Sequence, residues 1–168
     1  MVTRFGAADA HYPLSGGGHA ALVVSGGPEF GTIIEQRTAW LAEVADYAPG
    51  RFYERELPAL TALLADTDPL DVLIVDGYVD LDPDGRPGLG RHVWNAGLAP
   101  AVIGVAKTAF RSATHAEPVL RGSSSRPLYV TAAGISQTDA AYLVRTMSGT
   151  ARLPEALRLV DRLARSMP

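Results

Sequence analysis

The chain has 168 residues, 47% of them hydrophobic and 20% charged, which is the composition of a globular protein rather than a disordered one. Its net charge of −3 excludes a uniformly basic protein, so any contact with nucleic acid requires a local basic patch. The lack of cysteine excludes disulfides, thiolate nucleophiles and zinc sites built on Cys.

Length and hydropathy limit the organisation of the chain. We expect one domain over residues 1–168, because the length argues against two. The first residues lack a basic stretch followed by an apolar run, which favours the cytoplasm. No apolar run approaches the length needed to span a bilayer, so we expect no membrane partner.

The first forty residues predict an antiparallel meander. Strands are expected over residues 3–10, 19–25 and 31–37, because apolar stretches there are separated by turns rich in glycine and proline. After a break at residues 47–50, leucines at helical spacing predict a helix over 54–65. That helix accommodates Pro58 only if the proline lies in its first turn.

The rest of the chain predicts alternating strands and helices, with an irregular, mobile stretch over 111–126. The expected elements are a strand ending at Asp76, a helix over 87–98, strands over 101–106 and 128–131, and helices over 136–147 and 154–165. This order predicts an α/β fold in which an antiparallel meander and parallel strands form one mixed sheet flanked by helices. The first strand should lie beside the strand ending at Asp76.

Two apolar strands each end on a charged residue. Asp76 follows residues 71–75, and Lys107 follows residues 101–106. Open sheets place their active sites just beyond the carboxyl ends of strands. Lys107 is also the single lysine of the chain, against fourteen arginines. A compact ammonium donor suits a tight site beside a phosphate or carboxylate, where a broad guanidinium does not fit.

Three carboxylates from separate elements converge in this arrangement. Asp9 lies on the first strand, Glu56 at the start of the first helix, and Asp76 at a strand end. Such a set is typical of a Mg²⁺ or Mn²⁺ site, and like charges packed together are costly without a cation. The alternative is that they serve separately, as a polar strand end, an acid favoured by the helix dipole, and a turn former.

Several short motifs follow one another along the chain. They are Ala-Asp-Ala-His-Tyr at 8–12, Tyr-Ala-Pro-Gly at 47–50, Arg-Glu-Leu-Pro at 55–58, Val-Asp-Gly at 75–77, Gly-Val-Ala-Lys-Thr at 104–108, Pro-Leu-Tyr-Val at 127–130, Leu-Pro-Glu at 153–155 and Arg-Leu-Val-Asp at 158–161. In order and spacing they resemble the endonuclease V family over most of the chain. The resemblance implies a ribonuclease-H-like fold and a Mg²⁺-dependent site that cuts DNA, or in some cases RNA, near inosine.

The resemblance also implies roles for individual residues. Asp9, Glu56 and Asp76 would form the acidic set that binds the metal, and Lys107 would stabilise negative charge developing at the scissile phosphate. Asp161 matches a further position of the family's site. Tyr47, within the Tyr-x-Pro-Gly wedge that includes Pro49 and Gly50, would press into the duplex where the flipped base leaves it, with Phe52 and Gly77 also contacting the substrate.

The sequence departs from the family mainly where substrate is recognised. After Val-Asp-Gly the family usually continues with His or Asn, then Gly, then a His-Pro pair, whereas this chain has Tyr78, Val79 and Asp82 at those positions. We expect the branched Val79 to crowd an approaching purine, and the loss of the histidine at Asp82 to weaken catalysis.

The function favoured by these observations is a monomeric, metal-dependent endonuclease that acts on inosine in DNA or RNA. The alternatives are a nucleic-acid-binding module of the same fold that has lost turnover, and a metal-dependent nuclease with no preference for inosine. Arginines flanking the site would supply local phosphate contacts that the net charge hides. These are Arg51, Arg55, Arg86, Arg91, Arg111, Arg121 and Arg126.

Overall fold

The computed structural model describes residues 3–166 apart from positions 47, 50 and 52. One seven-stranded sheet runs through it, with the strand order β3-β2-β1-β4-β5-β7-β6. The strands are β1 (Phe5–His11), β2 (Gly18–Ser25), β3 (Ile33–Leu41), β4 (Val72–Asp76), β5 (Ala101–Ala106), β6 (Glu117–Val119) and β7 (Leu128–Ala133). The helices are α1 (Tyr53–Leu64), α2 (Leu89–Asn95), α3 (Gln137–Thr146) and α4 (Glu155–Arg165).

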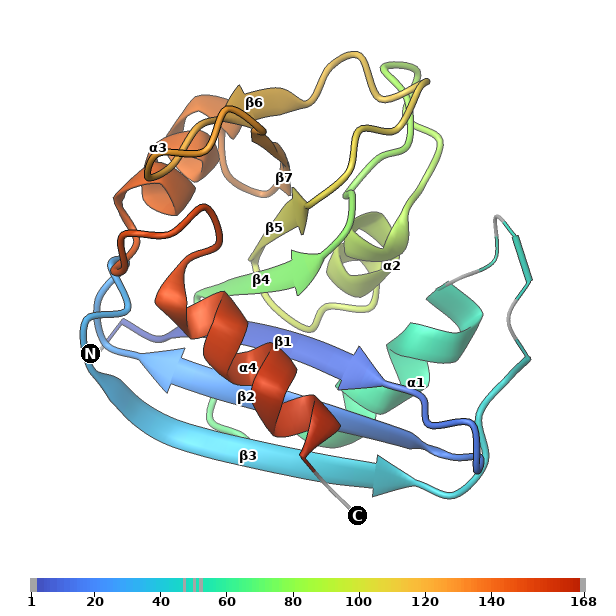
Figure 1. Ribbon diagram of the computed structural model, residues 1–168. Helices are drawn as coiled ribbons and strands as arrows, with labels where there is room; N and C mark the ends of the chain where they lie inside the picture. Colours follow the sequence, from blue (N-terminus) through green and yellow to red (C-terminus); the bar gives the residue numbers. More distant parts are fainter. Residues whose placement is uncertain (1–2, 47, 50, 52, 167–168) are drawn as a thin grey trace.

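The sheet is mixed, as the order of elements predicts. β1, β2 and β3 form an antiparallel meander, while β1, β4 and β5 run parallel and β5, β7 and β6 are antiparallel again. β1 pairs with β4, so the first strand lies beside the strand ending at Asp76, as expected. Figure 1 shows α4 crossing one face of β1 and β2, with α1 on the opposite face.

Two hydrophobic cores, one on each face, hold the helices to the sheet. Side chains of α3 and α4 pack with Ile74 and Ile103 on one face. Side chains of α1 and α2 pack with Leu22 and Leu73 on the other face. The central strands β2 and β5 are buried along their whole length, whereas β3 alternates between partly buried and exposed residues at an edge. Burial on both faces explains the nearly continuous apolar sequence of β2 and β5.

Helix boundaries partly follow the sequence. Ser136 caps α3 by accepting a hydrogen bond from the Asp139 backbone N–H at 3.1 Å, as its capping motif predicts. Pro58, expected in a first turn, is instead the sixth residue of α1 and lies inside the helix. Its ring faces solvent, so the loss of one backbone hydrogen bond there does not disturb the core.

The stretch over 111–126, expected to be irregular, contains strand β6, which pairs with β7 at the edge of the sheet. Only three residues pair, too few for a recognisable alternation in the sequence. Along the part of the chain that the structure describes, no helix combines the length and the apolar character needed to cross a membrane.

Gly104 on β5 allows the polypeptide after β4 to approach the sheet. A Cβ at this position would stand 2.6 Å from the Gly77 carbonyl oxygen, 2.8 Å from Thr131 Oγ1 and 2.9 Å from the Val79 nitrogen. The Val79 N–H donates to Thr131 Oγ1 at 2.8 Å, so the added carbon would intrude on a buried hydrogen bond. Gly104 therefore fixes the path of the chain directly after Asp76.

We predict that Gly104→Ala lowers the free energy of unfolding by about 1–3 kcal/mol, because the new methyl overpacks the site-bearing loop. Chemical denaturation measures the change. Gly26→Ala is the matched control, since nothing lies within 4 Å of its Cβ position, and it should change stability by less than about 0.5 kcal/mol. Equal stability of the two variants would show that Gly104 is not tightly packed.

Candidate metal and nucleic-acid site

All five predicted catalytic residues line one cavity of about 320 Å³ at the carboxyl ends of the parallel strands. The parallel pairing of β1 with β4 and of β4 with β5 brings the carboxyl ends of these strands together. α1 and α4 cover opposite faces of the sheet and add side chains at these strand ends. The five residues are Asp9 from β1, Glu56 from α1, Asp76 from β4, Lys107 after β5 and Asp161 from α4.

Asp9 lies close enough to Asp76, Asp161 and Lys107 for their charges to act on its carboxyl group. Burial raises its pKa well above the ordinary range, and the negative charge of Asp76 adds to the rise. The Ala10 backbone N–H, which donates to Asp9 Oδ1 at 2.9 Å, and the charge of Lys107 oppose it. Burial, together with repulsion between neighbouring carboxylates, thus keeps a proton on the site, and a cation would relieve the repulsion.

Glu56 is the most deeply buried acid of the group, with 7% of its surface exposed. It lies in the first turn of α1, on the face that packs against the sheet. Burial raises the pKa of Glu56 to about 8, the charges of Asp9 and Asp76 add to the rise, and the Arg55 guanidinium opposes it. The single Tyr12 hydroxyl proton is donated to the Arg55 carbonyl at 3.1 Å, so we regard Tyr12 as a neighbour of Glu56 rather than its donor.

Asp76 and Asp161 are more exposed than Glu56. Burial raises the pKa of Asp76, and Lys107 lowers it in part. Because the Asp76 side chain is open to solvent in the cavity, its desolvation has less weight than that of Glu56. Burial also acts on Asp161, but the Arg165 guanidinium, which donates to Oδ1 at 3.0 Å, outweighs it and keeps the Asp161 pKa below its ordinary value.

The donor set fits a hard divalent cation, since every acid presents carboxylate oxygens and the cavity is open to water. Within residues 3–166, without positions 47, 50 and 52, no three His, Cys, Asp or Glu side chains stand close enough to hold an ion by themselves. The carboxylates therefore share a cavity without forming a closed ligand cage, which leaves coordination positions for substrate oxygens and water.

A second, more apolar cavity of about 410 Å³ adjoins the first, and Asp76 lines both. Pro49 and Gly77, two of the predicted substrate contacts, lie in its wall together with Tyr53, Tyr78 and Phe110. The predicted contacts Tyr47, Gly50 and Phe52 lie outside the described residues. An apolar cavity with aromatic walls beside an acidic one suits a nucleobase next to its phosphate.

Val79, which we expected to crowd an approaching purine, does not line this cavity. Val79 is fully buried in the core between the sheet and α1 and α2, and it packs against Gly90 instead of lining the cavity. Asp82 lies apart from the carboxylates and closes a turn, where Oδ1 accepts hydrogen bonds from the backbone N–H groups of Asp84 and Arg86 at 3.0 Å each. Of the three changed residues, Tyr78 lines the cavity, whereas Val79 and Asp82 do not.

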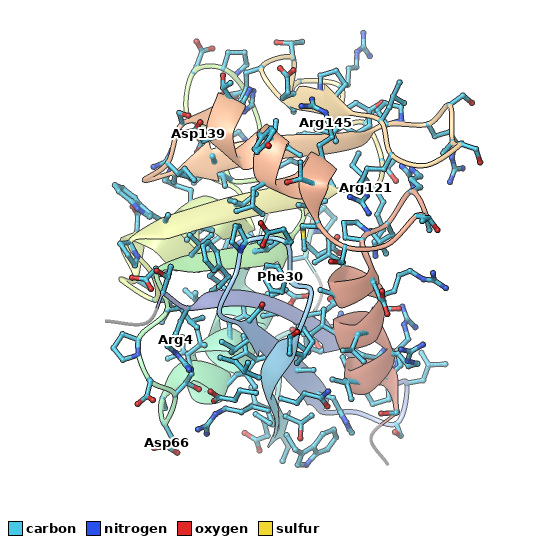
Figure 2. The ribbon with its side chains drawn as sticks, turned by 90° about the vertical axis from the view of Figure 1, so that its left-hand side faces the viewer. Arg4, Phe30, Asp66, Arg121, Asp139 and Arg145 are labelled. Atoms are coloured by element: carbon cyan, nitrogen blue, oxygen red, sulfur yellow. The ribbon has the colours of Figure 1, made fainter. Side chains whose placement is uncertain are left out.

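One side chain of the site, Tyr12, escaped the sequence analysis, whereas Arg55 was expected among the arginines that flank the site. The Arg55 guanidinium lies 4.0 Å from the centre of the Tyr12 ring, and both residues line the acidic cavity. The signal was available, because Tyr12 lies inside a motif that also contains a predicted acid. Arg121 was wrongly expected at the phosphate-binding surface: it is buried, with 6% exposed, and lies beside the end of α3 (Figure 2).

Comparison with known proteins identifies the family. A sequence model of endonuclease V matches residues 2–132 of this chain. The chain belongs to the endonuclease V family. A search of curated proteins gives no match.

Solved endonuclease V structures share the whole fold. Human ENDOV is 25% identical, with a TM-score of 0.78 over 98% of this chain and 83% of its own. Endonuclease V from Streptomyces avermitilis is 24% identical, with a TM-score of 0.80 over 98% and 81%. The enzyme from Ciona intestinalis, in complex with a 23mer DNA containing an inosine followed by a ribo-adenosine, is 20% identical, with a TM-score of 0.80 over 98% and 84%. The fold is therefore the ribonuclease-H-like fold of endonuclease V.

The buried carboxyl group of Glu56 predicts how the stability of the fold depends on pH. A carboxyl group whose pKa is raised in the folded state binds more protons there than in the unfolded state. Glu56 therefore destabilises the metal-free fold increasingly as pH rises from about 4.5 to about 8, with a slope of up to about 1.4 kcal/mol per pH unit. Glu56→Gln removes this slope, so the variant should gain stability over the wild type as pH rises.

Denaturant unfolding in EDTA at several pH values between 4 and 9 measures the difference, with pH values about one unit apart. Glu43→Gln, at an exposed residue outside the cavity, is the control and should keep the wild-type profile. If the difference in stability between wild type and Glu56→Gln stays constant over this window, Glu56 is not a buried acid with a raised pKa.

Proposed function

We propose that this protein is a metal-dependent endonuclease that hydrolyses a phosphodiester bond near inosine in nucleic acid. The observation that carries the proposal is that Asp76 lines two adjoining cavities. One is acidic and contains the five predicted catalytic residues, and the other is apolar with aromatic walls. One cavity is suited to a phosphate and its cation, and the other to an extruded base.

Asp9, Glu56 and Asp76 are the residues that would hold Mg²⁺, with Mn²⁺ as an alternative ion. When bound, such an ion acidifies an attacking water and offsets charge on the leaving oxygen. The raised pKa of Glu56 and of Asp9 means that these groups give up protons when a cation is bound. Loading of the site should therefore become easier toward higher pH.

Lys107 and Asp161 complete the polar wall. The Lys107 ammonium, beside Asp76, donates to oxygens of the scissile phosphate where negative charge develops. Asp161 is kept ionised by Arg165, so it accepts hydrogen bonds from water in the cavity. This side chain stays ionised at pH values where Glu56 still holds its proton.

The apolar cavity would receive the base. Tyr78 and Phe110 present ring surfaces with centroids 6.0 Å apart, and Pro49 and Gly77 shape the entrance beside Asp76. Tyr47, Gly50 and Phe52 are proposed to contact the strand next to the extruded nucleotide. The Ciona intestinalis relative was crystallised with inosine-containing DNA, which supports a nucleic-acid substrate for this chain.

We predict that the wild type nicks an oligonucleotide carrying one inosine in Mg²⁺ and that EDTA abolishes the nicking. Asp76→Ala should lower the rate by at least about 100-fold, because Asp76 borders both cavities and belongs to the acidic set. Gel separation of end-labelled strands measures the rate. Asp66→Ala, an exposed residue in the turn after α1, is the control and should cut at the wild-type rate.

The same assay separates the alternatives. A nuclease without base preference would cut a matched oligonucleotide with adenosine at the inosine position equally fast. A binding module without turnover would retain inosine-bearing strands in a gel shift and cut none of them in Mg²⁺ or Mn²⁺. Undiminished cutting by Asp76→Ala would refute the assignment of the site.

A further inference from the structure

Lys107 begins a segment that has little regular structure of its own. Between Lys107 and Ala116, the described backbone makes two hydrogen bonds to other backbone groups outside strands and helices, from Ala113 to Phe110 at 3.0 Å and from Ala116 to Ala113 at 3.2 Å. Both bonds lie beyond the lysine. β5 ends directly before Lys107, and beyond that strand the segment is held by side chains that reach it from elsewhere.

Tyr78 supplies the first of these contacts. Its hydroxyl donates to the Thr108 carbonyl oxygen at 2.7 Å and accepts from the Phe110 backbone N–H at 3.0 Å. The side chain is buried, with 9% of its surface exposed, and it directly follows Asp76-Gly77 in the chain. One hydroxyl thus connects the loop after β4 to the segment after β5.

Arg152 supplies the second contact, from the side of α4. Its guanidinium donates to the carbonyl oxygens of Lys107 at 2.5 Å, of Pro127 at 2.9 Å and of Arg126 at 2.9 Å. Within the described residues no carboxylate pairs with this arginine. A planar fork can reach three carbonyls at once, which an ammonium group on a single stem cannot do in the same geometry.

We propose that Tyr78 and Arg152 are positioning residues that hold the backbone at Lys107 and directly after it, and so fix where its ammonium group meets the acidic cavity. The part of this inference that concerns catalysis rests on the proposed function. Misplacing a charge-stabilising group by about 1 Å is enough to reduce turnover strongly.

The single lysine makes the position of Lys107 directly observable. Reductive methylation with ¹³C-formaldehyde labels Lys107 and the amino terminus, and Lys107→Arg identifies which methyl signal belongs to the lysine. In Tyr78→Phe and Arg152→Ala, the Lys107 signal should move toward its position in the unfolded protein and sharpen. Tyr142→Phe, the same chemical change at a tyrosine with 64% exposed surface, should leave the signal in place.

Two further measurements separate positioning from charge and from folding. Arg152→Lys retains the positive charge but loses the fork, so it should shift the Lys107 signal as Arg152→Ala does. Thermal unfolding of each variant establishes that the remaining fold is intact. An unchanged Lys107 signal in folded Tyr78→Phe would overturn the proposal, as would a wild-type signal in Arg152→Lys together with a shifted one in Arg152→Ala.

Cleavage kinetics test the consequence for catalysis. In Tyr78→Phe, kcat on the inosine oligonucleotide should fall about tenfold while KM changes by less than about twofold, because Phe keeps the ring that lines the apolar cavity. A shifted Lys107 signal with unchanged kcat would show that the contact does not serve catalysis. If the wild type cuts no inosine strand, the proposed function fails, and the methyl signal still decides the contact.

Discussion

The site depends on the parallel pairing of three neighbouring strands. Pairing of β1 with β4 and of β4 with β5 brings Asp9, Asp76 and Lys107 to one edge, although they lie far apart in the sequence. Like charges at that edge repel one another, so the arrangement lasts only because the two hydrophobic cores hold the strands in register. The packing free energy of the sheet thus offsets the electrostatic repulsion within the site.

The acids are not equivalent, and their environments separate their tasks. Glu56 is buried in the first turn of α1 and retains a proton near neutral pH in the absence of a cation. Asp161, on the opposite face of the sheet, is kept ionised by Arg165. A site with acids in different protonation states can respond to an incoming cation by releasing protons, while part of its charge is already present to attract that cation.

Arginine has a structural role in the irregular half of the molecule. Arg121 is buried without a described carboxylate partner and donates to the carbonyl oxygens of five residues around the end of α3, namely Val144, Arg145, Met147, Gly149 and Ala151. Arg152, the residue after Ala151, donates to three more carbonyl oxygens, those of Lys107, Arg126 and Pro127. The guanidinium groups of Arg121 and Arg152 supply hydrogen bonds that strand or helix pairing does not supply in these segments. This structural role explains in part why arginine predominates over lysine.

The sequence by itself determined the mixed sheet, the order of its elements, the family, and the acids and lysine that share the cavity. Strand periodicity and strand ends are local signals, and they place Asp76 and Lys107 without further information. Tertiary structure alone decided that Val79 enters the core, that Arg121 is buried, that β6 pairs at the edge, and that the Tyr78 hydroxyl reaches Thr108. Each of these depends on a partner distant in the chain, and the direction of a side chain in a loop has no periodic signal that would reveal it.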